Sequence, residues 1–216
     1  MPPLQNPQKA PTILLFLKAP REGYVKTRLA HNTGSKRALK AYRALVERQW
    51  IQIPKQSHIE VHYTPGDADF EMREWLGHEH QFYPQLEDEF GLRLEHSVKC
   101  AFERGAKTVF CIGGDCPNLN QPHFEQAAAA LLHDCDVVFG PSEDGGYYLI
   151  GLNAPQPEIF QNIPWSSQNT LESSLKNAAT LGLRIRLLET LYDIDEITEL
   201  QRAFHDGRLP LAIMED

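Results

Sequence analysis

The stretch that most constrains the fold is residues 108–117, TVFCIGGDCP. Residues 108–112 form a short apolar, β-branched run, which is typical of a strand buried on both faces of a parallel sheet. Two glycines end the run, and Pro117 prevents the hydrogen-bond ladder from continuing. Asp115 is therefore predicted at the carboxyl edge of a central strand, where open α/β sheets bind ligands. Taken alone, Asp115 fits a metal ligand and a turn-forming residue equally well.

The rest of the chain alternates strand and helix patterns, which predicts an α/β fold with a mostly parallel central sheet. Apolar runs predict buried strands at 12–17 and 136–140, and helical spacing of apolar residues predicts a long helix over 35–50. Further strands are predicted at 59–64, 80–83 and 184–188. Further helices are predicted at 69–76, 120–132 and 196–204, together with one that ends at about 104 and one that begins at 164–167. A chain of 216 residues is expected to form a single domain, 1–216, with residues 1–10 as a flexible N-terminal tail.

The composition argues against several classes of protein. A formal net charge of −8 argues against general nucleic-acid binding, which needs a basic surface. The four cysteines form no CxxC pair, as expected of reduced thiols in a cytoplasmic protein. The first ten residues lack a signal-peptide pattern, and no apolar run reaches membrane-spanning length. We therefore expect a cytoplasmic protein with no membrane span, whose oligomeric state stays open, a homodimer included.

The first predicted strand opens into a basic loop, residues 18–28. It carries Lys18, Arg21, Lys26 and Arg28 together with one proline and one glycine. Exposed backbone N–H groups combined with lysine and arginine make an anion site, for which phosphate is the usual guest. The loop is neither a Walker loop nor a GxGxxG fingerprint, which argues against a Rossmann oxidoreductase.

Acidic residues occur in two further segments that the predicted topology places near this edge. Residues 140–151, GPSEDGGYYLIG, put Glu143 and Asp144 before an aromatic, β-prone run, and a hairpin turn also explains the Asp-Gly pair. Residues 192–195, YDID, precede the last predicted helix, where acids also favour the positive helix N-terminus. A hard divalent cation prefers carboxylate oxygens and takes substrate phosphates as further ligands. These acids and the cations of the first loop therefore suit a nucleoside di- or triphosphate.

Five motifs carry a resemblance to a known family: FLKAP (16–20), VKTRL (25–29), GGDCP (113–117), GP followed by EDGGYYLIG (140–151) and PWS (164–166). On these motifs the chain resembles the radical-SAM/selenodomain-associated transferases, glycosyltransferase-like members of the GT-A (nucleotide-diphospho-sugar transferase) superfamily. The KTRL stretch is also similar to that of phosphoenolpyruvate/phospholactate guanylyltransferases. DEITEL (195–200) is similar to the DTPEDL ending of sugar nucleotidyltransferases, with Ile197 in place of proline. The resemblance implies a GT-A-like three-layer αβα sandwich.

The resemblance also implies roles for individual residues. Asp115 and Asp195 are implied as ligands of Mg²⁺ or Mn²⁺, with Asp193 as a substitute. The implied nucleotide-binding residues are Lys18, Ala19, Pro20, Lys26, Arg28, Gln85, Gly91, Arg93 and Gly114, of which Lys26 and Arg28 are also implied as catalytic. The acceptor is implied to lie against Gly145, Gly146, Tyr147 and Trp165, with Asp144 as its base. Where the family typically has Gly-Glu-Arg, this chain has Leu92 in place of the glutamate.

Two functions stay open at this point. The first is a metal-dependent transferase with a nucleotide sugar or an NTP as donor, for glycosyl transfer to a small acceptor or nucleotidyl transfer to a phosphorylated one. Asp144 as a base favours the glycosyl form, and the Lys-Thr-Arg loop favours the nucleotidyl form. The second is a catalytically degenerate nucleotide-binding module that acts through partners, which the departures at Leu92 and Ile197 favour.

Overall fold

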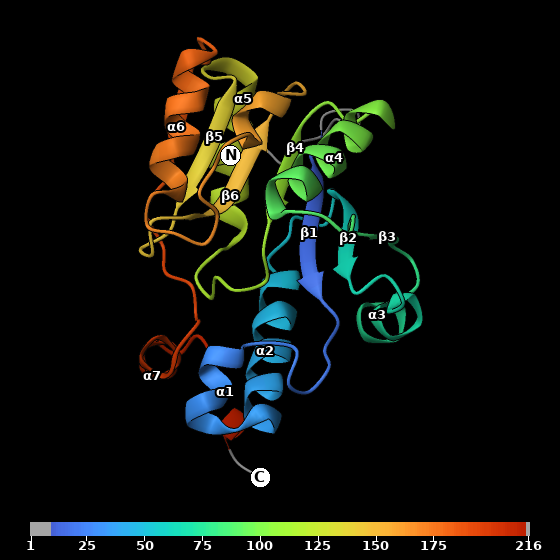
Figure 1. Cartoon of the computed structure of the whole chain (residues 1–216), viewed down its shortest axis with the longest axis vertical. Coiled ribbons are helices and arrows are strands. Elements are labelled where there is room, and N and C mark those ends of the chain that lie inside the picture. Colours follow the sequence, from blue (N-terminus) through green and yellow to red (C-terminus); the bar gives the residue numbers. More distant parts are fainter. Residues whose placement is uncertain (1–9, 215–216) are drawn as a thin grey trace.

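Seven strands and seven α-helices alternate along residues 10–214, the part of the chain that the computed structural model describes (Figure 1). The strands are β1 (Thr12–Lys18), β2 (His58–Thr64), β3 (Gln81–Pro84), β4 (Val109–Ile112), β5 (Val137–Pro141), β6 (Tyr147–Leu152) and β7 (Ile185–Leu187). The helices are α1 (Thr27–Thr33), α2 (Ser35–Trp50), α3 (Asp69–Leu76), α4 (Phe90–Glu103), α5 (Gln121–His133), α6 (Thr170–Thr180) and α7 (Ile197–His205), with 3₁₀ helices η2 (Pro157–Phe160) and η3 (Leu211–Met214). None of the helices in these residues has the length and apolarity that a membrane crossing requires. Except for Ala10, the predicted flexible tail lies outside the described residues.

The strands form one sheet in the order β3-β2-β1-β4-β6-β5-β7. The pairs β3–β2, β2–β1, β1–β4 and β5–β7 are parallel, whereas β6 is antiparallel to both β4 and β5. The carboxyl ends of β1, β4 and β5 therefore lie at one edge of the sheet, and the β5–β6 turn lies at the same edge.

Helices cover both faces of the sheet because successive strand residues point to opposite faces. Ile13, Leu15 and Leu17 of β1 pack with buried residues of α2, α3 and α5. Leu14 belongs to a second cluster, on the opposite face, with buried residues of α4 and α6. The three-layer αβα architecture with a mostly parallel sheet confirms the predicted fold class.

A third apolar cluster joins the beginning of the described chain to its end. Leu29 of α1 and Leu45 of α2 pack with Ile194, with Leu200 of α7 and with Ile213 of η3. In Figure 1, α1 and α2 lie below the sheet with α7 beside them. This packing brings the segment before α7 next to the basic loop that follows β1.

The predicted start of the helix that corresponds to α6, at residues 164–167, is wrong, because α6 begins at Thr170. Ser166 has a left-handed backbone, with a φ of 58°, which an α-helix does not contain. The hydroxyl groups of Ser167 and Thr170 both donate to the Pro164 carbonyl, at 2.7 and 2.9 Å, and stabilise a turn there instead. Lys26, with a φ of 47°, likewise precedes α1, a helix that was not predicted.

The hairpin predicted from the Asp-Gly pair is present between β5 and β6. The Ser142 N–H donates to the Gly146 carbonyl at 3.0 Å, and the Gly145 N–H donates to the Ser142 carbonyl at 3.1 Å. Gly145 has a φ of 88°, in the left-handed region that favours glycine. The turn thus brings Asp144 to the edge of the sheet that carries Asp115.

Candidate functional site

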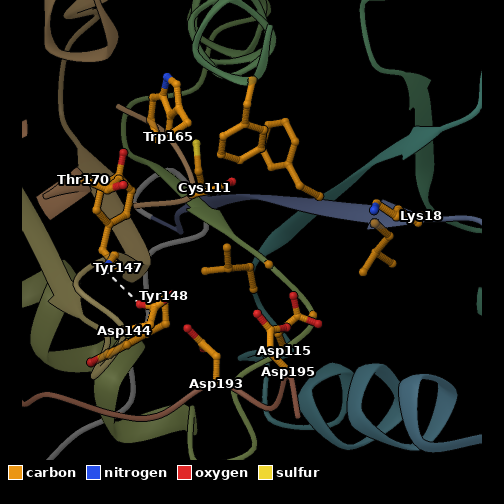
Figure 2. Close-up of a pocket in the computed structure, with 18 of the residues that line it drawn as sticks. Lys18, Cys111, Asp115, Asp144, Tyr147, Tyr148, Trp165, Thr170, Asp193 and Asp195 are labelled. Carbon is orange, nitrogen blue, oxygen red and sulfur yellow. Dashed lines mark hydrogen bonds between the residues drawn. The ribbon is translucent and has the colours of Figure 1, made fainter. Parts of the chain in front are cut away.

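A cleft of about 520 Å³ opens at the carboxyl edge of the sheet (Figure 2). It is lined by the ends of β1 and β4, the β5–β6 turn, the loop before α6 and the segment before α7. Most residues predicted for the site line it: Lys18, Lys26, Arg28, Gln85, Arg93, Gly114, Asp115, Asp144, Gly146, Tyr147, Trp165, Asp193 and Asp195. The fold therefore gathers predicted residues from segments that lie far apart in the sequence.

The ammonium group of Lys26 lies between two carboxylates in this cleft. Its Nζ is 2.6 Å from Asp115 Oδ1 and 3.0 Å from Asp195 Oδ1. The Lys26 side chain is 5% exposed, whereas those of the two acids are 44% and 51% exposed. Burial alone would lower the pKa of Lys26, but the two carboxylates outweigh burial and raise that pKa above its ordinary value. Two acids from distant segments thus share one positive charge.

Helix α2 holds the loop that carries Asp115. The side-chain amide of Gln49 donates to the Gly113 carbonyl, and Arg48 Nε donates to the Pro117 carbonyl at 2.8 Å. Gln49 is almost completely buried, so its hydrogen bond lies in the protein interior. Both ends of the Gly-Gly-Asp loop are therefore attached to one rigid helix.

Two further features fix the position of this loop. A Cβ atom at Gly114 would lie only 2.7 Å from Val46 Cγ2, so the loop approaches α2 this closely because the residue is glycine. The Ile194 N–H donates to the Asp115 carbonyl at 3.0 Å. Because Ile194 directly precedes Asp195, this bond sets the spacing of the two acids through the main chain.

Asp193 differs from the other acids in its surroundings. Its carboxylate accepts a hydrogen bond from the Ser142 hydroxyl. Burial, together with the nearby charges of Asp115 and Asp144, raises the pKa of Asp193 to about 7, even though the Ser142 bond opposes the shift. The Asp193 carboxyl group therefore ionises less readily than an ordinary aspartate.

Arg28 and Lys18 also line the cleft. Arg28 Nη1 lies 3.7 Å from Asp195 Oδ2, with a side chain that is 67% exposed. The Tyr42 hydroxyl accepts from the Lys18 N–H at 3.0 Å and donates to the Lys18 carbonyl at 2.8 Å, which fixes the end of β1. In the view of Figure 2, Asp115 and Asp195 lie between Lys18 and Asp144. The cleft therefore presents cations and acids side by side.

The predicted acceptor end of the cleft combines an acid with aromatic rings. Asp144 is exposed, and its Oδ1 accepts from the Gly146 N–H at 2.8 Å. The rings of Tyr147 and Trp165 meet edge to face, 6.2 Å apart, and Trp165 meets Phe90 in the same way at 5.0 Å. Burial raises the pKa of the Tyr147 phenol above its ordinary value. This end therefore offers one carboxylate beside an aromatic wall.

Four predicted site residues are not among the described residues that line the cleft: Ala19, Pro20, Gly91 and Gly145. Ala19 is buried in the core. A Cβ atom at Gly91 would lie 2.6 Å from Trp165 Nε1, and one at Gly145 would lie 2.2 Å from the Gln168 carbonyl oxygen. The structure thus gives both glycines a packing role, which lets Trp165 and the loop before α6 lie close to their neighbours.

Several lining residues were not predicted: Phe16, Tyr42, Phe90, Cys111, Ser166, Ser167 and Thr170. The position of Phe16 in the sequence offered a signal, because it lies near the carboxyl end of a buried strand, close to the sheet edge where ligands bind. Tyr42 belongs to the apolar stripe of a long helix, and nothing in that stripe marks it as a contact of β1. Phe90 begins a helix whose start was not predicted.

The fold and the cleft define an α/β protein with the architecture of nucleotidyl- and glycosyltransferase-like proteins. Residues 51–167 match the DUF2064 family, described as "Uncharacterized protein conserved in bacteria", and the chain belongs to this family. No curated protein matches the chain significantly.

Solved structures of transferases resemble this chain over most of its length. A candidate nucleotide-diphospho-sugar transferase from Desulfovibrio desulfuricans superimposes with a TM-score of 0.86 and 29% identity, over 94% of this chain and 90% of that chain. A 4-diphosphocytidyl-2C-methyl-D-erythritol synthase from Anaerococcus prevotii has a TM-score of 0.58 and 10% identity, over 92% and 99%. A nucleotidyl transferase from Methanothermobacter thermautotrophicus has a TM-score of 0.57 and 18% identity, over 91% and 97%. The last two share the fold of this chain.

Proposed function

We propose that the protein is a metal-dependent transferase of the nucleotide-diphospho-sugar transferase type, with a nucleotide sugar or an NTP as donor. The observation that carries the proposal is that Asp115 and Asp195 meet in a cleft at the carboxyl edge of the sheet. Their Oδ1 atoms lie 2.6 and 3.0 Å from the same Lys26 Nζ. Ligands of open α/β sheets bind at this edge. The similarity to the candidate transferase from Desulfovibrio desulfuricans supports the same class of donor.

The acids of the cleft suit a hard divalent cation. Mg²⁺ binds one or two carboxylates and completes its shell with water and substrate phosphates. Within residues 10–214, no group of three or more His, Cys, Asp or Glu side chains is placed to hold a metal ion, so the donor's phosphates would have to complete the site. Asp115 and Asp195 would hold Mg²⁺ or Mn²⁺, with Asp193 as a substitute. When bound, the ion would neutralise charge on the leaving phosphate group.

The chain's own side chains supply the rest of the proposed chemistry. Lys26 and Arg28 bind phosphate oxygens of the donor and neutralise the charge that develops on them, and Lys18 binds the phosphates from the side of β1. Asp144, whose Oδ1 is held by the Gly146 N–H, takes the proton of an acceptor hydroxyl on its other oxygen.

The proposal includes two forms of transfer. In the glycosyl form, the acceptor oxygen attacks the sugar carbon while its proton passes to Asp144, and the nucleoside diphosphate leaves. In the nucleotidyl form, an acceptor phosphate attacks the α-phosphorus of an NTP, and pyrophosphate leaves. Both forms place the leaving phosphates at the acids and cations described above.

Product analysis tests the proposal and separates its two forms. The full chain is incubated with Mn²⁺, a panel of NTPs and nucleotide sugars, and a pool of small acceptors. Pyrophosphate released from an NTP identifies nucleotidyl transfer, and a nucleoside diphosphate released from a nucleotide sugar identifies glycosyl transfer. Asp115→Asn should abolish Mn²⁺-dependent nucleotide binding, whereas Glu125→Gln, an exposed acid on α5 outside the cleft, should not change it. Unchanged Mn²⁺-dependent affinity in Asp115→Asn contradicts the proposal.

A second candidate is a nucleotide-binding module without catalysis that acts through a partner. The observation that favours it is the position of the Lys26 ammonium group, which already offsets one of the two negative charges of the acid pair. A module of this kind binds nucleotides equally well with and without Mn²⁺, and still binds them in Asp144→Asn. It also releases neither product from any donor in the panel, which distinguishes it from the transferase.

We further propose that the protein belongs to the radical-SAM/selenodomain-associated branch of these transferases and acts in the cytoplasm. The motifs around Lys18, Asp115 and Asp144 support the family assignment. The four cysteines are free thiols, which supports a reducing compartment. Cell fractionation with an antibody against the native protein tests the location, and recovery from a secreted fraction would contradict it.

A further inference from the structure

The side-chain amide of Gln85 is locked in one orientation at the end of the cleft formed by β1 and β2. Its Nε2 donates to the Leu17 carbonyl at 3.3 Å and to the His62 carbonyl at 2.8 Å. Carbonyl oxygens only accept hydrogen bonds, so the nitrogen and not the oxygen of the amide must face them. Gln85 Oε1 is therefore directed elsewhere, and it accepts from Arg93 Nη1 at 2.9 Å.

Arg93 is a cation without an acidic partner. Its guanidinium group lies over the ring of Phe90, 5.1 Å from the ring centre, and lines the cleft. Among residues 10–214 it forms no ion pair with a carboxylate, and its buried Nε has no hydrogen-bond partner. Arg104 and Arg184, by contrast, each pair with an acid. In a protein with a net charge of −8, an arginine held in place without an acid leaves donors for a ligand.

The position of Arg93 in the cleft indicates which part of a nucleotide it meets. Asp115 and Asp195 mark the phosphate end, near the end of β4, if the proposed function is correct. Gln85 bridges the ends of β2 and β1, and β1 separates β2 from β4 in the sheet. A nucleotide with its phosphates at the acids can therefore extend its base over β1 toward Gln85 and Arg93.

We propose that Arg93, oriented by Gln85, makes the site select guanine and uracil nucleotides over adenine and cytosine nucleotides. Guanine and uracil carry a carbonyl oxygen at O6 or O4, where adenine and cytosine carry an exocyclic amino group. This inference rests on the proposed function. An arginine side chain has five N–H donors and no acceptor, and the acceptor of Gln85 already serves Arg93. A carbonyl oxygen receives the free donors, whereas the exocyclic amino group of adenine or cytosine would bring a donor against a donor. Arginine also pairs in bidentate fashion with guanine O6 and N7.

Binding of the four nucleotides to the full chain tests the inference. Dissociation constants for GTP, UTP, ATP and CTP are measured by titration in the presence of Mn²⁺, with the corresponding diphosphates as a second series. The keto nucleotides should bind roughly tenfold to a hundredfold more tightly than the amino nucleotides. A preference for GTP alone or for UTP alone also supports the inference and shows which ring the site accepts.

Substitution of Arg93 connects the preference to this side chain. Arg93→Met keeps the length and the contact with Phe90 but removes every donor, so affinity for GTP and UTP should fall to that for ATP and CTP. Lys18→Met is the matched control, because a lysine that binds phosphates should weaken all four nucleotides by the same factor. Arg93→Lys keeps the positive charge but lacks the planar guanidinium group, so it should retain only part of the preference for GTP and UTP. The same variant replaces Arg93→Met in the test if Arg93→Met does not fold.

The outcomes separate failure of the inference from failure of the proposed function. Equal affinities for all four nucleotides, or an equal loss for all four in Arg93→Met, would overturn the selection by Arg93 and leave the proposed donor class intact. Absence of binding by any nucleotide or nucleotide sugar with Mn²⁺ overturns the proposed function and this inference together.

Discussion

Replacing Lys26 by methionine removes the charge that Asp115 and Asp195 share while keeping a side chain of similar length. At 2.6 and 3.0 Å, the two attractions together are worth about 3 kcal/mol in the dielectric of bulk water and about 12 kcal/mol at an effective dielectric constant of 20. Transfer of the ammonium group from water offsets several kcal/mol of the larger value, because the lysine side chain is only 5% exposed. Water also screens the two acids, which are about half exposed. We therefore expect Lys26→Met to lower the free energy of unfolding by about 2 kcal/mol.

Urea unfolding of the parent and of two variants measures this value. Arg28→Met is the matched control: Arg28 lies 3.7 Å from Asp195 and its side chain is 67% exposed, so its loss should be below about 0.5 kcal/mol. The midpoint should shift without a change of slope, since neither variant alters the surface exposed on unfolding. At about 1 M salt the loss in Lys26→Met should become smaller, because the remaining repulsion between the acids is screened.

The result that refutes this reasoning is an equal loss in Lys26→Met and Arg28→Met. The cost of removing the ammonium group from water would then cancel its attraction to both acids, and Lys26 would not stabilise the fold. A second measurement follows from the same geometry. Without the lysine, Asp115 and Asp195 face each other with no cation between them, so Mn²⁺ should raise the Tm of Lys26→Met more than that of the parent.

Two further predictions concern the loops around the cleft. Burial raises the pKa of Asp193 to about 7 from an unfolded value of 3.8, so the parent protein loses stability as the pH rises between these two values. The free energy of unfolding of Asp193→Asn should therefore exceed that of the parent by about 2 kcal/mol near pH 8 and by much less near pH 4. Urea unfolding at both pH values measures this difference in stability between Asp193→Asn and the parent. The same difference at pH 8 and at pH 4 would contradict the prediction. Gly145→Ala should cost about 3 kcal/mol or more, because the residue has a φ of 88° and its Cβ would meet the Gln168 backbone. Gly113→Ala, with no atom within 4 Å of its Cβ and no positive φ, should cost less than about 1 kcal/mol in the same assay.

The sequence allowed the sheet to be predicted because its central strands are apolar on both faces. The strands β1 and β4 are short runs of this kind, and breaker residues follow them closely: Pro20 after β1, and Gly113 and Gly114 after β4. From this it follows that Asp115 stands at the carboxyl edge, since parallel strands end there together. The helix over 35–50 was predicted with the bounds that α2 has, because its apolar stripe is long and uninterrupted.

The contacts that complete the cleft could not be predicted because they join distant segments through single side chains. Lys26 was expected on phosphates, and nothing in its sequence neighbourhood indicates that its ammonium group lies between Asp115 and Asp195. The pair of Gln85 and Arg93 depends on two backbone carbonyls of other strands. The start of α6 was missed because the left-handed backbone of Ser166 depends on hydrogen bonds to one carbonyl, which propensity does not describe.

Main-chain hydrogen bonds, in addition to the attraction of Asp115 and Asp195 to Lys26, keep the acids of this cleft together. The Leu191 N–H donates to the Pro141 carbonyl at 3.0 Å, the Glu143 N–H donates to the Leu191 carbonyl at 2.9 Å, and the Ile194 N–H donates to the Asp115 carbonyl at 3.0 Å. The segment before α7 thus runs along the carboxyl edge and joins the β5–β6 turn to the loop after β4. Because these bonds do not depend on ionisation, they can hold like charges side by side. Neutralising Asp115 or Asp195 should therefore change the affinity for a ligand far more than the stability of the fold, which distinguishes a binding site from an ion pair that serves only the structure.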